Sequence, residues 1–271
     1  MNARNMARVT LIFATALLLL PLVYQVGLSF KSPTEFFGNP LSPFPLQPTL
    51  EHYQGVLNRL PMGLYLLNSL LFSGAVTLGQ IGLAIPAAYA FSHRQFYGQN
   101  LLFSLIVLSM MIPFVITYIP NYLTIASWNL LGTLPGMILP FLGSGYSVFL
   151  LRQHFRAFPS SILEAAVVDG ASSSQVLWRV LVPANMAAIV SLGIYLFIQS
   201  WNQLIWPMLI ASSPRVYTLT VGVQRFAGGE GGNDWGALMA ASVLTNLPTI
   251  VLFLLVRKGL LATFTDGAVK G

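Results

Sequence analysis

The sequence predicts an all-α integral membrane protein with six transmembrane helices and a cytoplasmic helix–turn–helix loop. Its 271 residues are 55% hydrophobic and only 7% charged, whereas about a quarter of the residues in a soluble domain carry a charge. Six apolar segments reach the roughly 20 residues that a helix needs to cross a bilayer. One segment, Ile162–Pro183, is instead charged and amphipathic. With no internal repeat and no soluble stretch, residues 1–271 are predicted to form a single membrane domain.

The six predicted spans follow the apolar runs. In chain order they are Val9–Phe30, Leu64–Phe91, Leu101–Ala126, Leu134–Leu151, Ala187–Ala211 and Ala237–Val256. Prolines interrupt several of them, and neighbouring helices and polar side chains make this tolerable within a membrane. The first run follows Arg4 and Arg8, as in a signal peptide, but it is too long and lacks a clear small-x-small cleavage site. We therefore predict that it is a retained span.

The distribution of charge predicts the orientation. An even number of spans places both termini on one side. That side, which includes the Arg152–Pro183 loop, holds nine of the 13 Lys and Arg and three of the seven acidic residues, so the net charge of +6 falls on it. Cytoplasmic loops carry the excess of Lys and Arg. Both termini are thus predicted to be cytoplasmic, in a multi-pass protein of a bacterial or archaeal plasma (inner) membrane.

Composition also excludes several kinds of site. The chain has no cysteine and its three histidines are scattered, so no metal site is predicted. No Asp, Glu, His, Lys or Arg falls inside a predicted span, which excludes proton coupling by a buried carboxylate. No Ser–His–Asp or paired-carboxylate set lies at membrane depth, so the chain is not expected to be an enzyme. A self-sufficient secondary transporter, with a sodium site of carbonyls and hydroxyls, or a channel remains an alternative.

The charged segment is predicted to begin with a short helix. Residues 159–161 (PSS) can start it, and Glu164 is placed to complete a capping box, so the helix covers Ser161–Val168. Gly170 can then adopt the left-handed conformation that closes helices. The small side chains of Ala165 and Ala166 allow another protein to approach closely.

A second helix is predicted to follow the turn. Ser172 or Ser173 can cap it, and it runs through Leu181 before ending near Pro183. The result is a helix–turn–helix that protrudes from the membrane. From these residues alone, an ordinary connector between two spans is an equally good interpretation.

The same loop resembles that of a known family. Its letters EAAVVDGA…VLVP are similar to the EAA loop of ABC importer permeases, which is roughly E-A-A-x-x-D-G-A, a spacer and a hydrophobic-Pro ending. The resemblance continues in VFLLRQHF before the loop and in WNQLIWP, YTLTVGVQRF, DWGALMAASVL and GAVKG after it, and is looser in the first half of the chain. This pattern is similar to that of the maltose-permease-type carbohydrate importers, specifically their second, six-span subunit.

The resemblance implies partners and a role for the loop. The implied partners are a second, larger permease subunit, two ATP-binding subunits and an external solute-binding protein, within the lipid bilayer and without nucleic acid. ATP and Mg would bind in the ATPase subunits, and this chain would hold no cofactor. The helix pair is implied to dock into a cleft on an ATPase subunit and to couple ATP hydrolysis to transport through Glu164, Ala165, Ala166, Asp169 and Gly170.

Two sets of polar and aromatic residues are candidates for the solute pathway. The first lies at i, i+3, i+4, i+7 spacing on one face of the fifth predicted span, and the second flanks Pro120 in the third. Amides and aromatic faces suit the hydroxyls and C–H groups of a sugar or polyol. Helix–helix hydrogen bonding and interfacial anchoring are the alternative roles. The residues are Gln199, Asn202, Gln203 and Trp206, and Tyr118, Asn121 and Tyr122.

An outer loop is rich in glycine and is a candidate contact for the binding protein. Glycine permits backbone conformations that other residues avoid. In the family, the loop between the last two spans enters the sugar cleft of the binding protein, and this loop has the same place; a mobile turn without a partner is the alternative. The residues are Gly228, Gly229, Glu230, Gly231 and Gly232.

The predicted function is that of a permease subunit in a binding-protein-dependent ABC importer for a carbohydrate-class solute. The subunit would form half of a heterodimeric pathway that ATP hydrolysis in partner subunits drives. The same machinery importing sn-glycerol 3-phosphate or a related polyol phosphate is an alternative. So is the self-sufficient transporter or channel.

Overall fold

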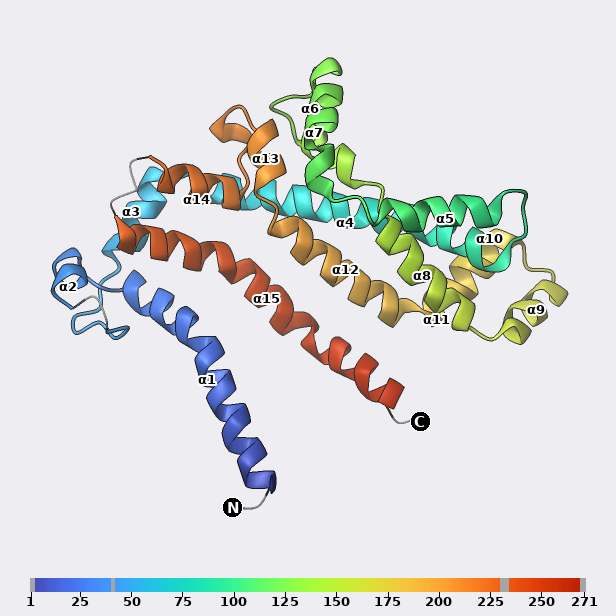
Figure 1. The fold of residues 1–271 in the computed structure, drawn as a ribbon, viewed down its shortest axis with the longest axis horizontal. Coiled ribbons are helices and arrows are strands. Elements are labelled where there is room, and N and C mark those ends of the chain that lie inside the picture. Colours follow the sequence, from blue (N-terminus) through green and yellow to red (C-terminus); the bar gives the residue numbers. More distant parts are fainter. Residues whose placement is uncertain (1–2, 40–41, 230–233, 269–271) are drawn as a thin grey trace. The chain divides into compact units, whose positions relative to one another are not determined.

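A computed structural model describes residues 3–39, 42–229 and 234–268 of the chain (Figure 1). All regular secondary structure in these residues is helical, which confirms the predicted all-α class. The chain divides into two compact units. Met1–Leu64 and Leu219–Leu252 form the first unit, and Tyr65–Thr218 and Phe253–Gly271 form the second.

The first unit combines the N-terminal part of the chain, including the long segment after the first span, with residues 219–252. Its helices are α1 (Ala3–Ser29), α2 (Pro33–Gly38), α3 (Glu51–Arg59), α14 (Leu219–Ala227) and the first half of α15 (Trp235–Ala268).

Polar contacts hold the C-terminal end of α1 against the segment that follows it. The hydroxyl of Ser29 lies 2.7 Å from that of Tyr53, and the Tyr53 ring packs 5.1 Å from Phe30. The fully buried Lys31 donates from Nζ to the carbonyl of Asn39. A cation just past the end of α1 also suits the negative end of the helix dipole.

A charged cluster joins α3 to the start of α15. Asp234 accepts a hydrogen bond from the Ala237 amide at 2.9 Å, which caps the first turn of α15. The same carboxylate lies 3.4 Å from Nδ1 of the buried His52 and 3.7 Å from Nη1 of Arg59. Asp234 therefore fixes both the start of the last long helix and its position relative to α3.

Besides the end of α15, the second unit contains most of α4 and all the helices that follow it as far as η4. In chain order they are α4 (Met62–His93), α5 (Gln99–Ser109), η1 (Phe114–Thr117), α6 (Tyr118–Ser127), α7 (Leu134–Ile138), η2 (Leu139–Phe141), α8 (Gly145–Ala157), α9 (Ser160–Val168), α10 (Ser173–Gln175), the π-helix η3 (Val176–Leu181), α11 (Val182–Ala184), α12 (Met186–Trp201), α13 (Ile205–Ile210) and η4 (Pro214–Val216).

Of the six predicted spans, three are single helices and the other regions are broken. By length and apolar composition, Arg4–Ser29, Met62–His93 and Trp235–Leu252 can each cross a membrane, and three bent helix pairs would bring the total to six. The pairs are Gln99–Ser109 with Phe114–Ser127 (94°), Leu134–Phe141 with Gly145–Ala157 (48°) and Ser173–Ala184 with Met186–Trp201 (77°). The third pair differs from the prediction, because it joins α12 to the preceding short helices rather than to α13.

Proline explains where two of the predicted spans break. Pro113 lies between α5 and η1, at the 94° bend. Pro207 lies in the first turn of α13, where its missing N–H costs nothing. A helix continuing from α12 would require Pro207 to bond the carbonyl of Gln203, and its ring would clash there. The chain therefore leaves the helix after Trp201 and starts a new one at Ile205.

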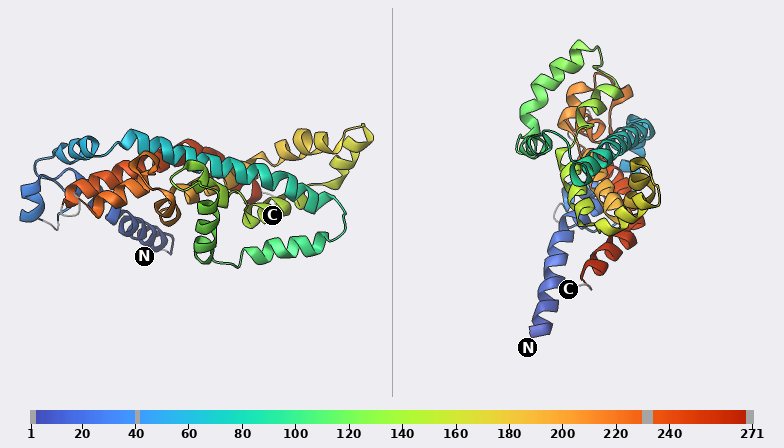
Figure 2. Two further views of the ribbon diagram at one scale, coloured as in Figure 1. Left: turned by 90° about the horizontal axis from the view of Figure 1, so that it is seen from above. Right: turned by 90° about the vertical axis from the view of Figure 1, so that its right-hand side faces the viewer.

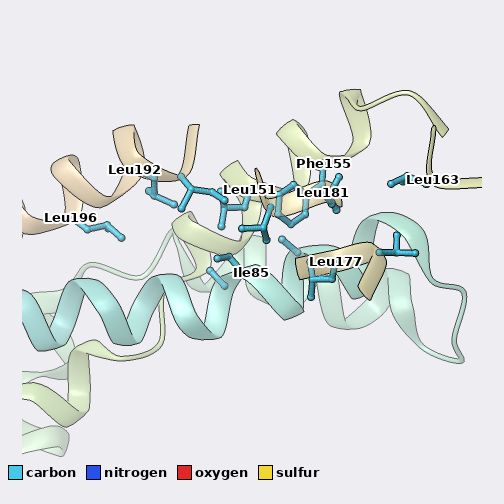
Figure 3. Close-up of a cluster of buried hydrophobic side chains, with 13 residues drawn as sticks. Ile85, Leu151, Phe155, Leu163, Leu177, Leu181, Leu192 and Leu196 are labelled. Carbon is cyan, nitrogen blue, oxygen red and sulfur yellow. The ribbon is translucent and has the colours of Figure 1, made fainter. Parts of the chain in front are cut away.

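A row of buried aliphatic side chains forms the main core of the second unit. In Figure 3 the labelled side chains extend from Leu196 and Leu192 on α12, past Leu151 and Phe155 on α8, to Leu163 on α9. Figures 1 and 2 show α9 and the neighbouring α10 at the far end of this unit. This core therefore connects the protruding helix pair to α4, α8 and α12.

Candidate functional site

The first helix of the predicted helix–turn–helix closes as the sequence indicates. α9 covers Ser160–Val168, and Gly170 has φ +86°. The Ala171 amide bonds the Ala166 carbonyl and the Gly170 amide bonds the Val167 carbonyl, both at 3.0 Å. This pair of bonds is the Schellman motif, which needs a left-handed residue at the position of Gly170. The predicted role of Gly170 in the turn is confirmed.

The predicted capping box at the start of α9 is not formed. Pro159 occupies the N-cap position, without a side-chain cap bond, and Ser160 is already helical. A capping box forms instead at the second helix, where Ser172 Oγ accepts from the Gln175 amide and Gln175 Oε1 accepts from the Ser172 amide. Because Glu164 is not used as a cap, its exposed carboxylate remains on the surface of the pair.

The second helix runs past Leu181 and ends at Ala184, one residue after Pro183, which is close to the predicted end. It passes from α10 through the π-helix η3 into α11, and Pro183, which cannot donate a backbone hydrogen bond, is its second-last residue. The chain then bends by 77° at Asn185 and enters α12. The side-chain amide of Asn185 donates to the Leu181 carbonyl at 2.9 Å, which satisfies an acceptor near the helix end. The second helix of the pair is therefore joined through Asn185 to α12, a long apolar helix.

The helix pair is anchored on one face and exposed on the other. Leu163 from α9 and Val176, Leu177 and Leu181 from η3 are buried in the core shown in Figure 3. On the opposite face Glu164 and Ala165 are exposed, and Val168 is 87% exposed. Exposed apolar side chains beside a carboxylate are typical of a surface that another protein covers.

Of the four pathway candidates near the fifth predicted span, Trp206 is the one buried in the core. The break after Trp201 removes the single helical face that the spacing predicted. Gln199 lies exposed on α12, Asn202 is exposed at its end and Gln203 is partly buried in the break. Trp206 is fully buried, and its Nε1 donates to the Met137 carbonyl at 3.0 Å.

The candidates in the third predicted span partly meet Trp206. The Tyr118 ring stacks 6.1 Å from the Trp206 ring, and both Tyr118 and Tyr122 pack against the cluster of buried side chains that contains Trp206. Asn121 donates to Thr117 Oγ1 at 3.2 Å within its own helix. The structure thus brings Trp206, Tyr118 and Tyr122 together, and leaves Gln199 and Asn202 outside this cluster.

A buried polar face of α4 was missed by the sequence analysis. Asn68 donates to the carbonyls of Arg215 and Tyr217 at 2.9 and 3.0 Å, and Gln80 donates to the Phe141 carbonyl at 2.7 Å. Between them Ser73 and Thr77 are also buried. The steps of four and three residues from Ser69 through Ser73 and Thr77 to Gln80, all buried in an apolar helix, were the signal that could have revealed this face.

The glycine-rich loop is only partly described. Gly228 and Gly229 follow the end of α14 and are exposed. Glu230, Gly231 and Gly232 lie outside the described residues. In the described part of the chain, no three His, Cys, Asp or Glu side chains are grouped so as to hold a metal ion.

Comparison with known proteins places these features in context. The family model described as "Binding-protein-dependent transport system inner membrane component" matches residues 80–262. The sn-glycerol-3-phosphate transport system permease protein UgpE of Yersinia pestis bv. Antiqua is 33% identical over 265 residues, covering 95% of this chain and 94% of its own. UgpE of Escherichia coli O1:K1 is 30% identical over 263 residues, with 94% of each chain covered.

A solved structure has the same fold. One chain of a bacterial ABC transporter involved in the import of the acidic polysaccharide alginate superposes with a TM-score of 0.82 and covers 93% of this chain and 94% of its own. The two sequences are 22% identical. The similarity therefore concerns the arrangement of helices.

Proposed function

The chain belongs to the family of binding-protein-dependent transport system inner membrane components, and from this premise we propose how it works and what it carries. It is a multi-pass inner-membrane permease subunit of an ABC importer and not an ATPase. A system of this kind implies ATPase subunits, a second permease subunit and a solute-binding protein as partners. In our proposal the chain forms half of a heterodimeric pathway, with a larger permease as the other half. Two ATPase subunits bind ATP and Mg.

The exposed face of the helix pair carries the proposal. The exposed Glu164, Ala165, Asp169 and Gly170, together with Ala166, which is partly buried against the core, form the coupling surface that docks on an ATPase subunit. The Schellman turn at Gly170 holds the two helices at a fixed angle, and the buried Leu163 fixes α9 to the core. A force on the exposed carboxylate of Glu164 is thereby passed to α4, α8 and α12. Docking requires the helix pair to face the cytoplasm, and the distribution of Lys and Arg supports the proposal that both termini lie on the same side.

The proposed solute is of the carbohydrate class. The aromatic ring of Tyr118 offers a face for C–H groups, and the amides of Gln199, Asn202 and Gln203 offer hydrogen bonds for hydroxyls. In the described structure Trp206 is fully buried and donates its N–H to Met137, so it would support the Tyr118 ring rather than meet the solute itself. Gly228 and Gly229, with the residues that follow them, are proposed to meet the binding protein on the outer side.

A second candidate solute is sn-glycerol 3-phosphate. The names of the curated relatives support it, since both UgpE proteins cover nearly the whole chain at 30% identity or more. Purified solute-binding protein encoded with this permease distinguishes the two candidates when it is titrated calorimetrically with oligosaccharides, glycosides and sn-glycerol 3-phosphate. Tight binding of a neutral sugar supports the first candidate, and binding of the phosphate ester alone supports the second.

Glu164→Ala is expected to uncouple the importer. Truncating one partner of a buried interfacial charge pair costs about 2–5 kcal/mol, so ATP hydrolysis stimulated by the loaded binding protein should fall at least about tenfold. Basal hydrolysis and assembly should persist. The assay is ATP hydrolysis and solute uptake by the complete complex in proteoliposomes. Glu51→Ala, which removes an equally exposed carboxylate from α3, is the matched control. Normal stimulation of the Glu164 variant would contradict the proposed coupling surface.

A further inference from the structure

A groove lies between α9 and the end of α4. It has a volume of about 430 Å³, within the roughly 300–1,000 Å³ of typical ligand pockets. The end of α4 contributes Tyr89, His93 and Arg94, and α9 contributes Glu164 and the buried Leu163. The groove therefore has a basic wall, an acidic wall and an apolar floor.

The basic wall is held in a defined geometry. Nη2 of Arg94 donates to the Tyr89 hydroxyl at 3.2 Å, and its guanidinium carbon lies 5.4 Å from the centroid of the Tyr89 ring. Such a cation–π contact orients the guanidinium. In the described part of the chain, neither Arg94 nor Glu164 forms an ion pair. Both charges can therefore serve a partner.

The basic wall is also fastened to α8. Nε2 of His93 lies 3.0 Å from the Phe155 carbonyl, which accepts a hydrogen bond from it. In the reverse direction, Nε of Arg152 on α8 donates to the Phe91 carbonyl of α4 at 2.9 Å. Phe155 is itself fully buried. Anything that binds in the groove thus acts on the ends of two long helices at once.

We propose that this groove receives side chains of the ATPase subunit, and that Arg94 is a docking residue opposite Glu164. This inference rests on the proposed function of the helix pair and extends the docking surface to α4. The groove fits a partner segment with one apolar side chain for the floor, an acidic residue facing Arg94 and a basic residue facing Glu164. The ATPase then moves α4 directly, in addition to moving α9.

Cross-linking tests where the partner lies. The chain has no cysteine, so single variants can be made in the natural sequence and combined with an ATPase subunit carrying a photoreactive or cysteine-directed linker. Arg94→Cys and Ala165→Cys should both cross-link to the ATPase subunit in the assembled complex. Tyr97→Cys, fully exposed in the same loop but outside the groove, is the control and should remain unlinked.

The pattern of cross-links tests the groove and the coupling surface separately. Cross-linking at position 165 but not at position 94 would overturn the groove and leave the coupling surface standing. No cross-link at either position would overturn both. Cross-linking at both positions, with none at 97, supports the groove.

Charge reversal tests whether Arg94 contributes to docking. Arg94→Glu places a like charge against the partner's acid, and such a contact costs several kcal/mol, so stimulated ATP hydrolysis should fall at least about tenfold. Arg94→Lys should retain most of it. Arg156→Glu, an exposed cation of α8 outside the groove, should change it less than about twofold.

The same assay excludes a lipid as the occupant. If Arg94 instead binds an anionic headgroup, the loss in Arg94→Glu should vary with the fraction of phosphatidylglycerol in the vesicles. It should also vanish in vesicles of neutral lipid. That outcome would overturn the proposal. A loss of the same size in vesicles with and without phosphatidylglycerol supports it.

Discussion

Gly170→Pro is expected to reduce solute uptake and stimulated ATP hydrolysis by more than about tenfold, while the complex still assembles in the membrane. Proline fixes φ near −65°, and the native φ at this position is +86°. The substitution also removes the amide that bonds the Val167 carbonyl at 3.0 Å. The turn cannot form, so α9 and the second helix lose their fixed angle. The measurement is uptake of labelled solute by proteoliposomes together with ATP hydrolysis.

Alanine substitutions give a graded comparison. A left-handed conformation costs a non-glycine residue about 1–2 kcal/mol, so Gly170→Ala should have an intermediate effect. Gly98 has a similar φ of +78° and, like Gly170, open space around its α-carbon. Gly98→Ala therefore introduces the same backbone strain outside the helix pair. An equal loss of coupling in both alanine variants would show that general strain, not the turn at Gly170, is responsible.

Trp206→Ala is expected to destabilise the folded chain by about 3–5 kcal/mol. The indole is fully buried, stacks on Tyr118 and donates to the Met137 carbonyl. Its removal leaves a cavity and an unpaired acceptor in the same place. The free energy of unfolding can be measured by titrating the protein in mixed micelles with sodium dodecyl sulfate.

Two further variants identify the cause of that loss. Trp206→Phe keeps an aromatic ring but removes the N–H, so about 1–3 kcal/mol should be lost for the unsatisfied carbonyl. Trp128→Ala removes an indole that is 58% exposed and should change stability by about 0.5 kcal/mol or less. If Trp206→Ala unfolds at the wild-type detergent concentration but lowers uptake, the indole acts in the pathway and not in the core.

Local chemistry explains why parts of the helix pair could be predicted from the sequence. The conformation of Gly170 depends on neighbouring backbone bonds, and the Ser172 cap depends on residues within three positions. Both features could therefore be predicted from a short stretch of sequence. The Glu164 capping box was not formed because Pro159, rather than a serine, took the cap position. Because Ser160 and Ser161 directly follow Pro159, the sequence alone does not show which of these residues is the N-cap.

The solute-pathway candidates depended on a helix that does not exist. The spacing of Gln199, Asn202, Gln203 and Trp206 defines one face only if the chain is helical throughout. Membrane helices tolerate some prolines and break at others, and here the chain breaks because Pro207 cannot continue a helix from α12. Pro86 and Pro248 lie inside continuous helices. Which outcome occurs is decided by neighbouring helices, and sequence spacing does not contain that information.

The groove at the end of α4 was also beyond local inference. Tyr89 and Arg94 are five residues apart, and their contact with each other is local. Their position opposite Glu164 results from packing between segments about 70 residues apart in sequence. Periodicity can show that α4 has a buried polar face, but it cannot show what lies across from the helix end.

The row of buried side chains from Leu196 to Leu163 also has a mechanical consequence. A close-packed protein interior has low compressibility and transmits strain. The row of side chains is therefore expected to deform little when α9 is displaced relative to α12. A displacement at the protruding end is delivered at nearly full amplitude to α8 and α12, with little of the work stored in between. Truncating one buried side chain of the row, as in Leu177→Ala, would leave a cavity. The protruding helix pair could then move by some distance before α8 and α12 are displaced.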